Sequence, residues 1–168
     1  MKISVALSNN LLPDKYGKHA AANDIKNGKP IISFPIKLSD IPADAKTIAL
    51  IFTDPDSIPV CGFEWIHWTA ANIPSSQVEI PENFSQTATA PIVQGKNSSA
   101  SPLFDGSKDV AIGYNGPNPP DQIHDYVLKA FALDDNLDLE NGFWMNDLLH
   151  KMDGHILATA KKTLPSRA

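Results

Sequence analysis

The stretch Gly113-Tyr114-Asn115-Gly116-Pro117-Asn118-Pro119-Pro120-Asp121-Gln122-Ile123-His124-Asp125-Tyr126 decides how this chain is interpreted. Three prolines within four positions fix the backbone φ angle and remove N–H donors, while the two glycines permit close approaches of the backbone. The pattern predicts a stiff loop that runs into a strand. His124 and Tyr126 are two residues apart on that strand, so their side chains point to the same face and would form the wall of a polar pocket.

Size and composition indicate one soluble globular domain over residues 1–168. A chain of this length buries a core without disulfides or structural metals, and the single Cys61 excludes an internal disulfide framework and a cysteine-based zinc site. The net charge of -5 argues against nucleic-acid binding. The apolar runs are shorter than the roughly 20 residues of a membrane span, and the polar amino terminus does not resemble a signal peptide. We therefore expect a cytoplasmic protein without integral membrane contact.

Proline frequency predicts a mainly β fold, because the 14 prolines are scattered between short apolar runs. Strands are expected at residues 30–38 (as an edge or bulged strand, since Pro35 interrupts it), 47–53, 65–72, 110–114, 124–133 and 155–160. A helix is expected at 143–152, beginning near Asn141 and stopping at Gly154, and a weaker one at 13–23. Residues 81–108 read as a long loop with short ordered pieces.

Two carboxylates, Asp54 and Asp56, follow the most apolar run of the chain, residues 47–53. A buried strand has a fixed end, so side chains there are well placed to enter a pocket. The alternative is an Asx-Pro turn whose carboxylates are solvated.

An indole and an imidazole lie on the next predicted strand. Strand alternation puts Trp65 and His67 on one face and Ile66 and Trp68 on the other. The alternative is a hydrogen-bonded core histidine beside packing tryptophans. The remaining histidines and aromatic residues are not expected to bind a ligand. We place His19 at the surface and His150 on the late helix, and we expect a structural role for His155 and packing roles for Trp144 and Met145.

The combined side chains suit a phosphate or carboxylate group. Imidazoles with an ordinary pKa of about 6.5, a phenol and the N–H groups of a glycine turn all donate hydrogen bonds to an anion. No Lys or Arg is expected at this site, so binding should be modest and pH-sensitive. Gly-x-Ser-x-Gly and the glycine-rich phosphate loops do not occur. Two alternatives stay open: a hydrolase whose Asp/His pairs act as general acid and base, and a metal site formed by Asp54, Asp56, His67 and His124.

The three groups of residues, at 54–56, 65–68 and 113–126, occur in an order that resembles the phosphatidylethanolamine-binding protein family, also called the Raf kinase inhibitor protein family. Asp54-Pro55-Asp56 is similar to its Asp-Pro-Asp signature, residues 65–68 to its Trp/His strand, and residues 113–126 to its Gly-x-Gly-Pro-x-Pro-Pro…His-x-Tyr signature. Flanking features resemble the bacterial branch typified by YbhB and YbcL: residues 41–42, 72–74, 131–134 and 154–158.

The resemblance implies two packed antiparallel sheets with a few peripheral helices and a small preformed anion pocket at one end. In the family that pocket accepts phosphate-like or phospholipid head groups. Because hydrogen-bond donors converge and no nucleophile motif occurs, we expect a non-enzymatic binding protein without a cofactor. A protein partner, kinase-inhibitor-like regulation and a homodimer are further expectations. The residues carried over to the pocket are Asp54, His67, His124 and Tyr126 with the Gly116/Pro117 region, and Asp56 and Trp65 at or beside it.

The chain departs from the family pattern in two places. The common His-Arg-Tyr is His124-Asp125-Tyr126 here, and alternation points Asp125 away from the pocket face, so the pocket should be retained. The bacterial ending Gly-x-Tyr-x-Arg is replaced by Thr163-Leu164-Pro165-Ser166-Arg167, which lacks the tyrosine.

Overall fold

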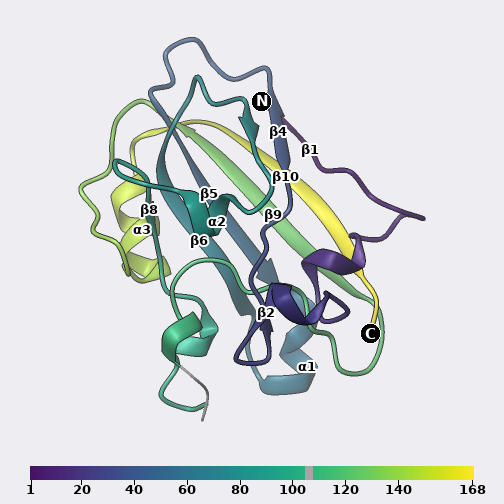
Figure 1. Cartoon of the computed structure of the whole chain (residues 1–168). Helices are drawn as coiled ribbons and strands as arrows, with labels where there is room; N and C mark the ends of the chain where they lie inside the picture. Colours follow the sequence, from purple (N-terminus) through teal and green to yellow (C-terminus); the bar gives the residue numbers. More distant parts are fainter. Residues whose placement is uncertain (105–107) are drawn as a thin grey trace.

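The computed structural model describes residues 1–104 and 108–168 and consists of two packed antiparallel sheets, as predicted. The large sheet has the strand order β10-β9-β5-β6-β8. Its strands are β5 (Thr47–Asp54), β6 (Trp65–Pro74), β8 (Val93–Gln94), β9 (His124–Leu133) and β10 (Ile156–Ser166). Figure 1 shows these strands side by side through the middle of the molecule. The loops that connect them therefore gather at the two ends of the sheet.

The small sheet has the order β1-β4-β7 and covers one face of the large sheet. Its strands are β1 (Lys2–Ser4), β4 (Ile36–Ser39) and β7 (Glu79–Ile80), and a separate hairpin pairs β2 (Ile25–Lys26) with β3 (Lys29–Pro30). The predicted strand 30–38 is therefore split, because Pro35 cannot donate to a ladder. Its second half is the central strand of the small sheet rather than an edge.

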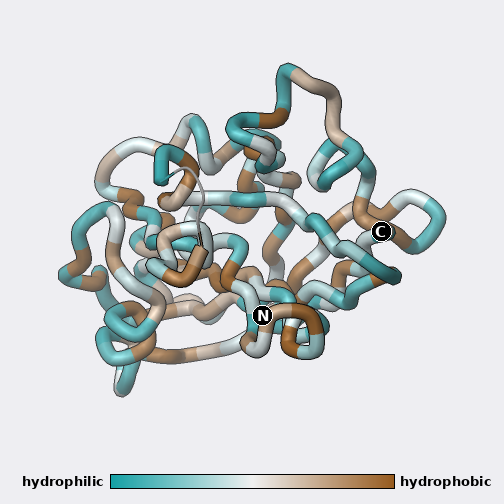
Figure 2. The backbone as a smooth tube through the Cα atoms, turned by 90° about the horizontal axis from the view of Figure 1, so that it is seen from below, coloured by the Kyte–Doolittle hydropathy of each residue, from teal (hydrophilic) through white to brown (hydrophobic). Residues whose placement is uncertain are grey.

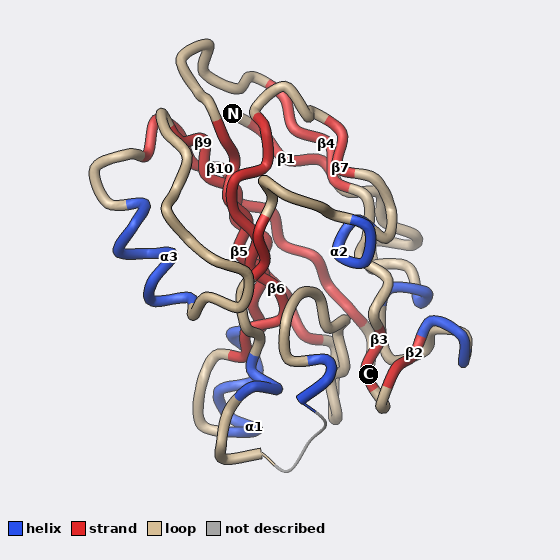
Figure 3. The backbone as a smooth tube through the Cα atoms, turned by 60° about the vertical axis from the view of Figure 1, so that its left-hand side comes forward, coloured by secondary structure: helices blue, strands red, loops and turns tan. Residues whose placement is uncertain are grey.

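Side-chain alternation along β5 builds two cores. Ile48, Leu50 and Phe52 face the small sheet, whereas Ala49 and Ile51 face the opposite layer. That second layer is formed by α3 (Met145–Met152), which Figure 3 shows on the opposite side of the large sheet from β1, β4 and β7. Because both faces are covered, all eight residues of β5 are buried, and the predicted continuous apolar strand is confirmed.

Helices are short and peripheral. Besides α3 they are α1 (Ile58–Cys61), α2 (Phe84–Thr87) and 3-10 turns at Asp14–Tyr16, Ala22–Asp24, Pro55–Ser57, Ser98–Ala100 and Lys108–Val110. The helix expected at 13–23 was wrong, since two isolated turns replace it. The helix expected at 143–152 begins at Met145, where the Asp147 carboxylate accepts the N–H of Trp144 at 3.0 Å.

Three further expectations need correction. Residues 110–114 form no strand, and within them Ile112 makes an isolated bridge to Lys96. The last strand begins at Ile156 rather than at 155 and continues to Ser166. Trp144 does not pack in the core, because it is 44% exposed and lies under the Lys96 ammonium at 4.5 Å from its ring. Residues 105–107, within the predicted loop 81–108, lie outside the described residues.

An irregularity in β6 changes which way its side chains point. Phe52 pairs with Trp68 and the next residue, Thr53, pairs with Ile66, so His67 is an extra residue opposite the ladder. Such a β-bulge interrupts alternation. Trp68 and His67 consequently both belong to the side that faces the small sheet, where Phe52 lies 5.7 Å from the His67 ring and Tyr114 lies 5.8 Å from Trp68. The predicted opposition of His67 and Trp68 was wrong.

Hydrophobic segments are short throughout the chain. Figure 2 shows brown stretches that alternate with teal and white ones along the tube. None of the helices within the described ranges has the length and apolar character needed to cross a membrane.

Candidate ligand-binding pocket

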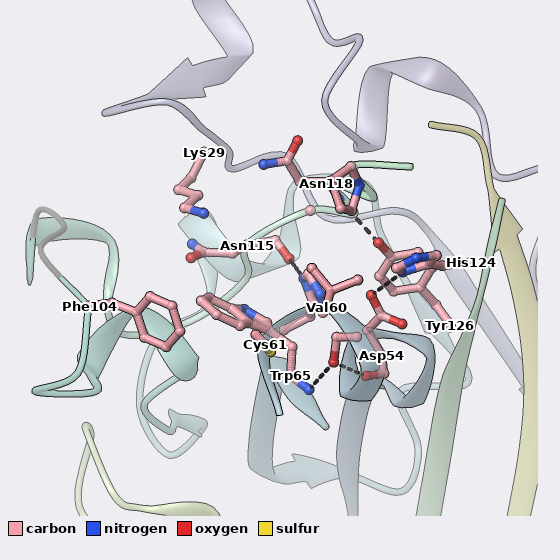
Figure 4. Close-up of a pocket in the computed structure, with 14 residues that line it drawn as sticks. Lys29, Asp54, Val60, Cys61, Trp65, Phe104, Asn115, Asn118, His124 and Tyr126 are labelled. Carbon is pink, nitrogen blue, oxygen red and sulfur yellow. Dashed lines mark hydrogen bonds and ion pairs between the residues drawn. The ribbon is translucent and has the colours of Figure 1, made fainter. Parts of the chain in front are cut away.

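A cavity of about 230 Å³ lies at the end of the large sheet where β5 ends and β6 and β9 begin, beside α1. Six of the eight predicted site residues line it, and Figure 4 shows how the labelled side chains lie around it. The lining residues are Lys29, Asp54, Ser57, Val60, Cys61, Trp65, His67, Phe104, Asn115, Gly116, Asn118, Pro120, His124 and Tyr126.

His124 is held between two carboxylates. Its Nδ1 lies 2.8 Å from Oδ2 of Asp54 and its Nε2 lies 3.0 Å from Oδ1 of Asp121. Burial opposes the charged imidazole, but the hydrogen bonds and negative charges of Asp54 and Asp121 outweigh it and raise the pKa of His124. His124 therefore carries more positive charge near neutrality than a free histidine.

His67 has the opposite character. Its Nδ1 lies 2.8 Å from the carbonyl oxygen of Asn115, and its own carbonyl accepts the Asn115 N–H at 2.9 Å. Burial is the main influence and lowers the pKa of His67 to about 4, against the smaller opposing effects of the Asn115 hydrogen bond and the Asp54 charge. This imidazole is neutral at pH 7.

Tyr126 supplies the phenol of the pocket. Its hydroxyl oxygen accepts the N–H of Asn118 at 3.2 Å. Burial first, and then the negative charge of Asp54, raise the pKa of Tyr126, so the hydroxyl keeps its hydrogen. Its ring also packs against His67, with centroids 5.0 Å apart.

The proline loop is anchored by a buried asparagine that the sequence analysis did not single out. The Asn115 amide donates to the Val110 carbonyl at 3.0 Å and accepts from the Ser99 hydroxyl at 2.8 Å. The N–H of Gly116 donates to the Pro30 carbonyl at 2.8 Å. A Cβ atom at Gly116 would overlap the Tyr16 carbonyl oxygen. The loop is thus fixed from three directions before any ligand arrives.

A lysine and three aromatic rings form the mouth of the pocket. Lys29 Nζ lies 5.5 Å from the Trp65 ring centroid, Phe104 meets Trp65 edge-on at 4.9 Å, and Phe63 stacks on it at 5.9 Å. Burial lowers the pKa of Lys29. The expectation that the site has no Lys or Arg was therefore wrong. The Asn27-Gly28 pair is typical of a β-hairpin turn, so the sequence could have predicted that Lys29 follows such a turn. It could not have predicted that Lys29 reaches Trp65.

Two predicted site residues lie outside the lining set. A carboxylate oxygen of Asp56 accepts the N–H of Asp125 at 2.7 Å, and the Pro117 carbonyl accepts the N–H of Lys18 at 2.8 Å. Each of these bonds holds a segment that carries a lining residue, because Asp125 adjoins His124 and Pro117 adjoins Gly116. Asp125 is exposed, in agreement with the alternation argument. In the described part of the chain, no group of three or more His, Cys, Asp or Glu side chains is arranged to hold a metal ion.

Comparison with known proteins identifies the family and the fold. The sequence model described as phosphatidylethanolamine-binding protein matches residues 2–165. The chain belongs to the phosphatidylethanolamine-binding protein family. Within that family, the Bacillus subtilis protein YxkA, described as uncharacterized, is 49% identical over 162 residues, covering 95% of this chain and 96% of the relative. A UPF0098 protein from Methanothermobacter thermautotrophicus is 38% identical over 132 residues, covering 77% of this chain and 79% of the relative.

Solved structures agree with the assignment. The family homologue CT736 from Chlamydia trachomatis is 32% identical, with a TM-score of 0.77 over 99% of this chain and 97% of that one. Escherichia coli YbcL has the same TM-score of 0.77 at 22% identity, covering 99% of this chain and 98% of that one, which shows a shared fold.

Proposed function

We propose that this protein is a non-enzymatic binding protein whose preformed pocket takes a small anion of the size of phosphate. The observation that carries the proposal is Lys29. Among the ion pairs of the described residues none includes its ammonium, which lies over the Trp65 ring and lines the cavity. His124 adds positive charge to the opposite wall, and the Asn118 amide and the Tyr126 hydroxyl lie between them.

Binding without turnover is supported by how the reactive groups are engaged. Both nitrogens of His124 face carboxylates. The Ser57 hydroxyl oxygen accepts the Trp65 N–H at 2.9 Å and lies 2.6 Å from the Asp54 carbonyl oxygen, so it serves the local backbone. A general base needs a free lone pair directed at substrate, and a serine nucleophile needs a base beside it.

Phosphate titration tests the proposal, with binding measured by calorimetry on wild type, Lys29→Met and Lys26→Met. Lys26 is an exposed lysine on the same hairpin and serves as the matched control. We expect about tenfold weaker binding in Lys29→Met, since a charge-assisted hydrogen bond contributes about 1.5 kcal/mol, and unchanged binding in Lys26→Met. Equal losses in both variants, or no binding by wild type, would contradict the proposal. Hydrolysis of p-nitrophenyl phosphate that disappears in His67→Gln would contradict the non-enzymatic assignment.

We further propose that the anion is carried by a larger partner. Val60 at the cavity wall is 49% exposed. Ile58, Leu103 and Ile123, each directly next to a lining residue in the chain, are 50%, 81% and 54% exposed. Exposed apolar side chains in the segments that line the pocket favour contact with more than the anion. A phosphorylated peptide should therefore bind more tightly than free phosphate, and Leu103→Ser should remove that gain. No gain over free phosphate would contradict this part.

A further inference from the structure

The large sheet ends at β10, which pairs only with β9 in the described part of the chain (Figure 1). Two hydrogen bonds show which way the backbone of β10 is turned. The Pro165 carbonyl accepts the N–H of Leu12 at 2.7 Å, and Asp125, which lies opposite Pro165 on β9, donates its N–H to Asp56 at 2.7 Å. Pro165 and Asp125 therefore form a non-hydrogen-bonded pair of the antiparallel ladder.

The alternation of the ladder places the neighbouring backbone groups of β10. In steps of two from Pro165, the residues Thr163, Lys161 and Thr159 also belong to non-hydrogen-bonded pairs, so their N–H and C=O groups point away from β9. No described residue is hydrogen-bonded to these groups, and β1, which packs against β10, pairs with β4 instead. The outer edge at 159–163 is therefore open to pairing with another chain.

Two lysines face each other beside this edge. Lys161 is directly opposite Lys129 of β9, and because their pair is not hydrogen-bonded, their Cα atoms belong to the closer class of about 4.5 Å. Neither ammonium takes part in an ion pair or a side-chain hydrogen bond within the described residues. Like charges in directly opposite positions destabilise a sheet, so the arrangement favours an anionic group beside both lysines.

Protection of the edge does not explain both charges. A lysine on an edge strand discourages pairing between copies, and Lys161 alone would serve that purpose. Lys129 lies on β9, which is paired on both sides, so its charge is not needed there. A second copy paired through β10 would bring its own Lys161 and Lys162 to the same place and add to the repulsion. The charges therefore favour an acidic partner over a second copy.

We propose that the outer edge of β10 binds an extended, acidic protein segment, which adds to the large sheet as a further strand and places a carboxylate beside Lys161 and Lys129. Backbone hydrogen bonds to Thr159, Lys161 and Thr163 supply affinity, and the two lysines select the charge. Lys129 would lie two inter-strand spacings, about 10 Å, from the added strand, which a lysine and a glutamate side chain together can span. None of these four residues lines the pocket, so the inference goes beyond the anion-binding function and does not depend on it.

Peptide binding measured by fluorescence anisotropy tests the selection of charge. The probe is a fluorescein-labelled peptide that alternates glutamate with valine, and its control has lysine in place of glutamate. We expect the acidic peptide alone to bind the wild-type protein, and Lys129→Gln to weaken it about threefold by removing one exposed ion pair. Lys162→Gln is the matched control and should bind like wild type, because Lys162 is on the other face of β10 and turns its N–H toward β9.

Amide hydrogen exchange and a proline substitution test the pairing itself. The amides of Thr159, Lys161 and Thr163 should exchange quickly in the free protein and become protected by the acidic peptide. Lys161→Pro should abolish binding and retain the fold, verified by circular dichroism, since proline is tolerated on an edge strand where the N–H faces solvent.

Several results would overturn the inference. They are the absence of binding by wild type, equal binding of the two peptides, equal weakening in Lys129→Gln and Lys162→Gln, and binding that leaves the three amides unprotected. A wild-type dimer that Lys161→Pro dissociates in analytical ultracentrifugation would assign the edge to a second copy and would also overturn it.

Discussion

Nδ1 of His124 lies 2.8 Å from Oδ2 of Asp54, although the two residues are 70 positions apart in the chain, and their side chains are 1% and 4% exposed. A second pair, His155 and Asp134, has the same 2.8 Å separation but side chains that are 44% and 45% exposed. One geometry thus occurs in two environments, which lets burial be separated from distance.

Removing one partner of each pair should have unequal effects. Asp54→Ala leaves His124 buried without its main counter-charge and should lower the free energy of unfolding by about 3 kcal/mol. Asp134→Ala breaks a half-exposed pair and should lower it by less than about 1 kcal/mol. Urea denaturation of the two variants measures both values. Equal effects would mean that burial does not decide the contribution of the pair.

Acid should destabilise the protein through His67. The unfolded chain takes up a proton at the ordinary histidine pKa of 6.5, whereas the folded protein resists until about pH 4. The contribution of neutral His67 to the free energy of unfolding is therefore fully present above pH 6.5. It is lost between pH 6.5 and pH 4, which lowers the free energy of unfolding by about 3 kcal/mol. We expect this loss to be absent in His67→Gln, so unfolding free energies of the two proteins at pH 4, 5, 6 and 7 isolate it. Parallel curves would show that His67 titrates normally in the folded protein.

The contact at Gly116 should tolerate no side chain. Gly116→Ala would push its Cβ into the Tyr16 carbonyl and to 2.8 Å from Cβ of Pro30, the residue after Lys29. We expect the free energy of unfolding to fall by about 3 kcal/mol, the upper end of the range for overpacking, because the Tyr16 backbone cannot move aside as a flexible side chain can. Gly28→Ala is the control, since nothing lies within 4 Å of its Cβ and only its φ of +74° is unfavourable. That control should lose about 1 kcal/mol in thermal or urea unfolding.

Trp65 should report on pocket occupancy. It lines the cavity, whereas Trp144 lies on α3's N-terminal side under Lys96 and Trp68 is fully buried. Phosphate added to wild type should change the tryptophan fluorescence, and Trp65→Phe should abolish the change. Trp144→Phe should retain it. A response that survives in Trp65→Phe would place the anion elsewhere.

The parts of the fold that sequence predicted are those with local causes. The apolar run 47–53 and the alternation at 124–133 describe strands whose burial is set by their own residues. Residues 110–114 misled the prediction, because Tyr114 is buried for a different reason. Its ring packs on Phe34 and Phe52, and its hydroxyl donates to the Tyr16 carbonyl at 2.7 Å. Apolar content there serves core contacts of a loop rather than a ladder.

The parts of the site that sequence missed depend on distant partners. Nothing near Lys29 in the chain indicates that its hairpin lies over Trp65. Asn115 belongs to the proline loop that the sequence singles out. Its anchoring role depends on the Ser99 hydroxyl and the Val110 carbonyl, which lie on other segments. The orientation of Trp68 follows from the pairing of β6 with β5, so no inspection of β6 alone could have revealed it.

The extra residue at His67 makes the pocket depend on the number of residues in β6 as well as on their identity. Deleting one residue there would let Ile66 and Trp68 follow regular alternation opposite β5, with the hydrogen-bond ladder of the sheet retained. The imidazole wall would be lost, and no substitution elsewhere on the strand could restore it. Insertions and deletions in this strand are therefore a separate class of change, able to take the His67 imidazole out of the pocket while the sheet itself remains.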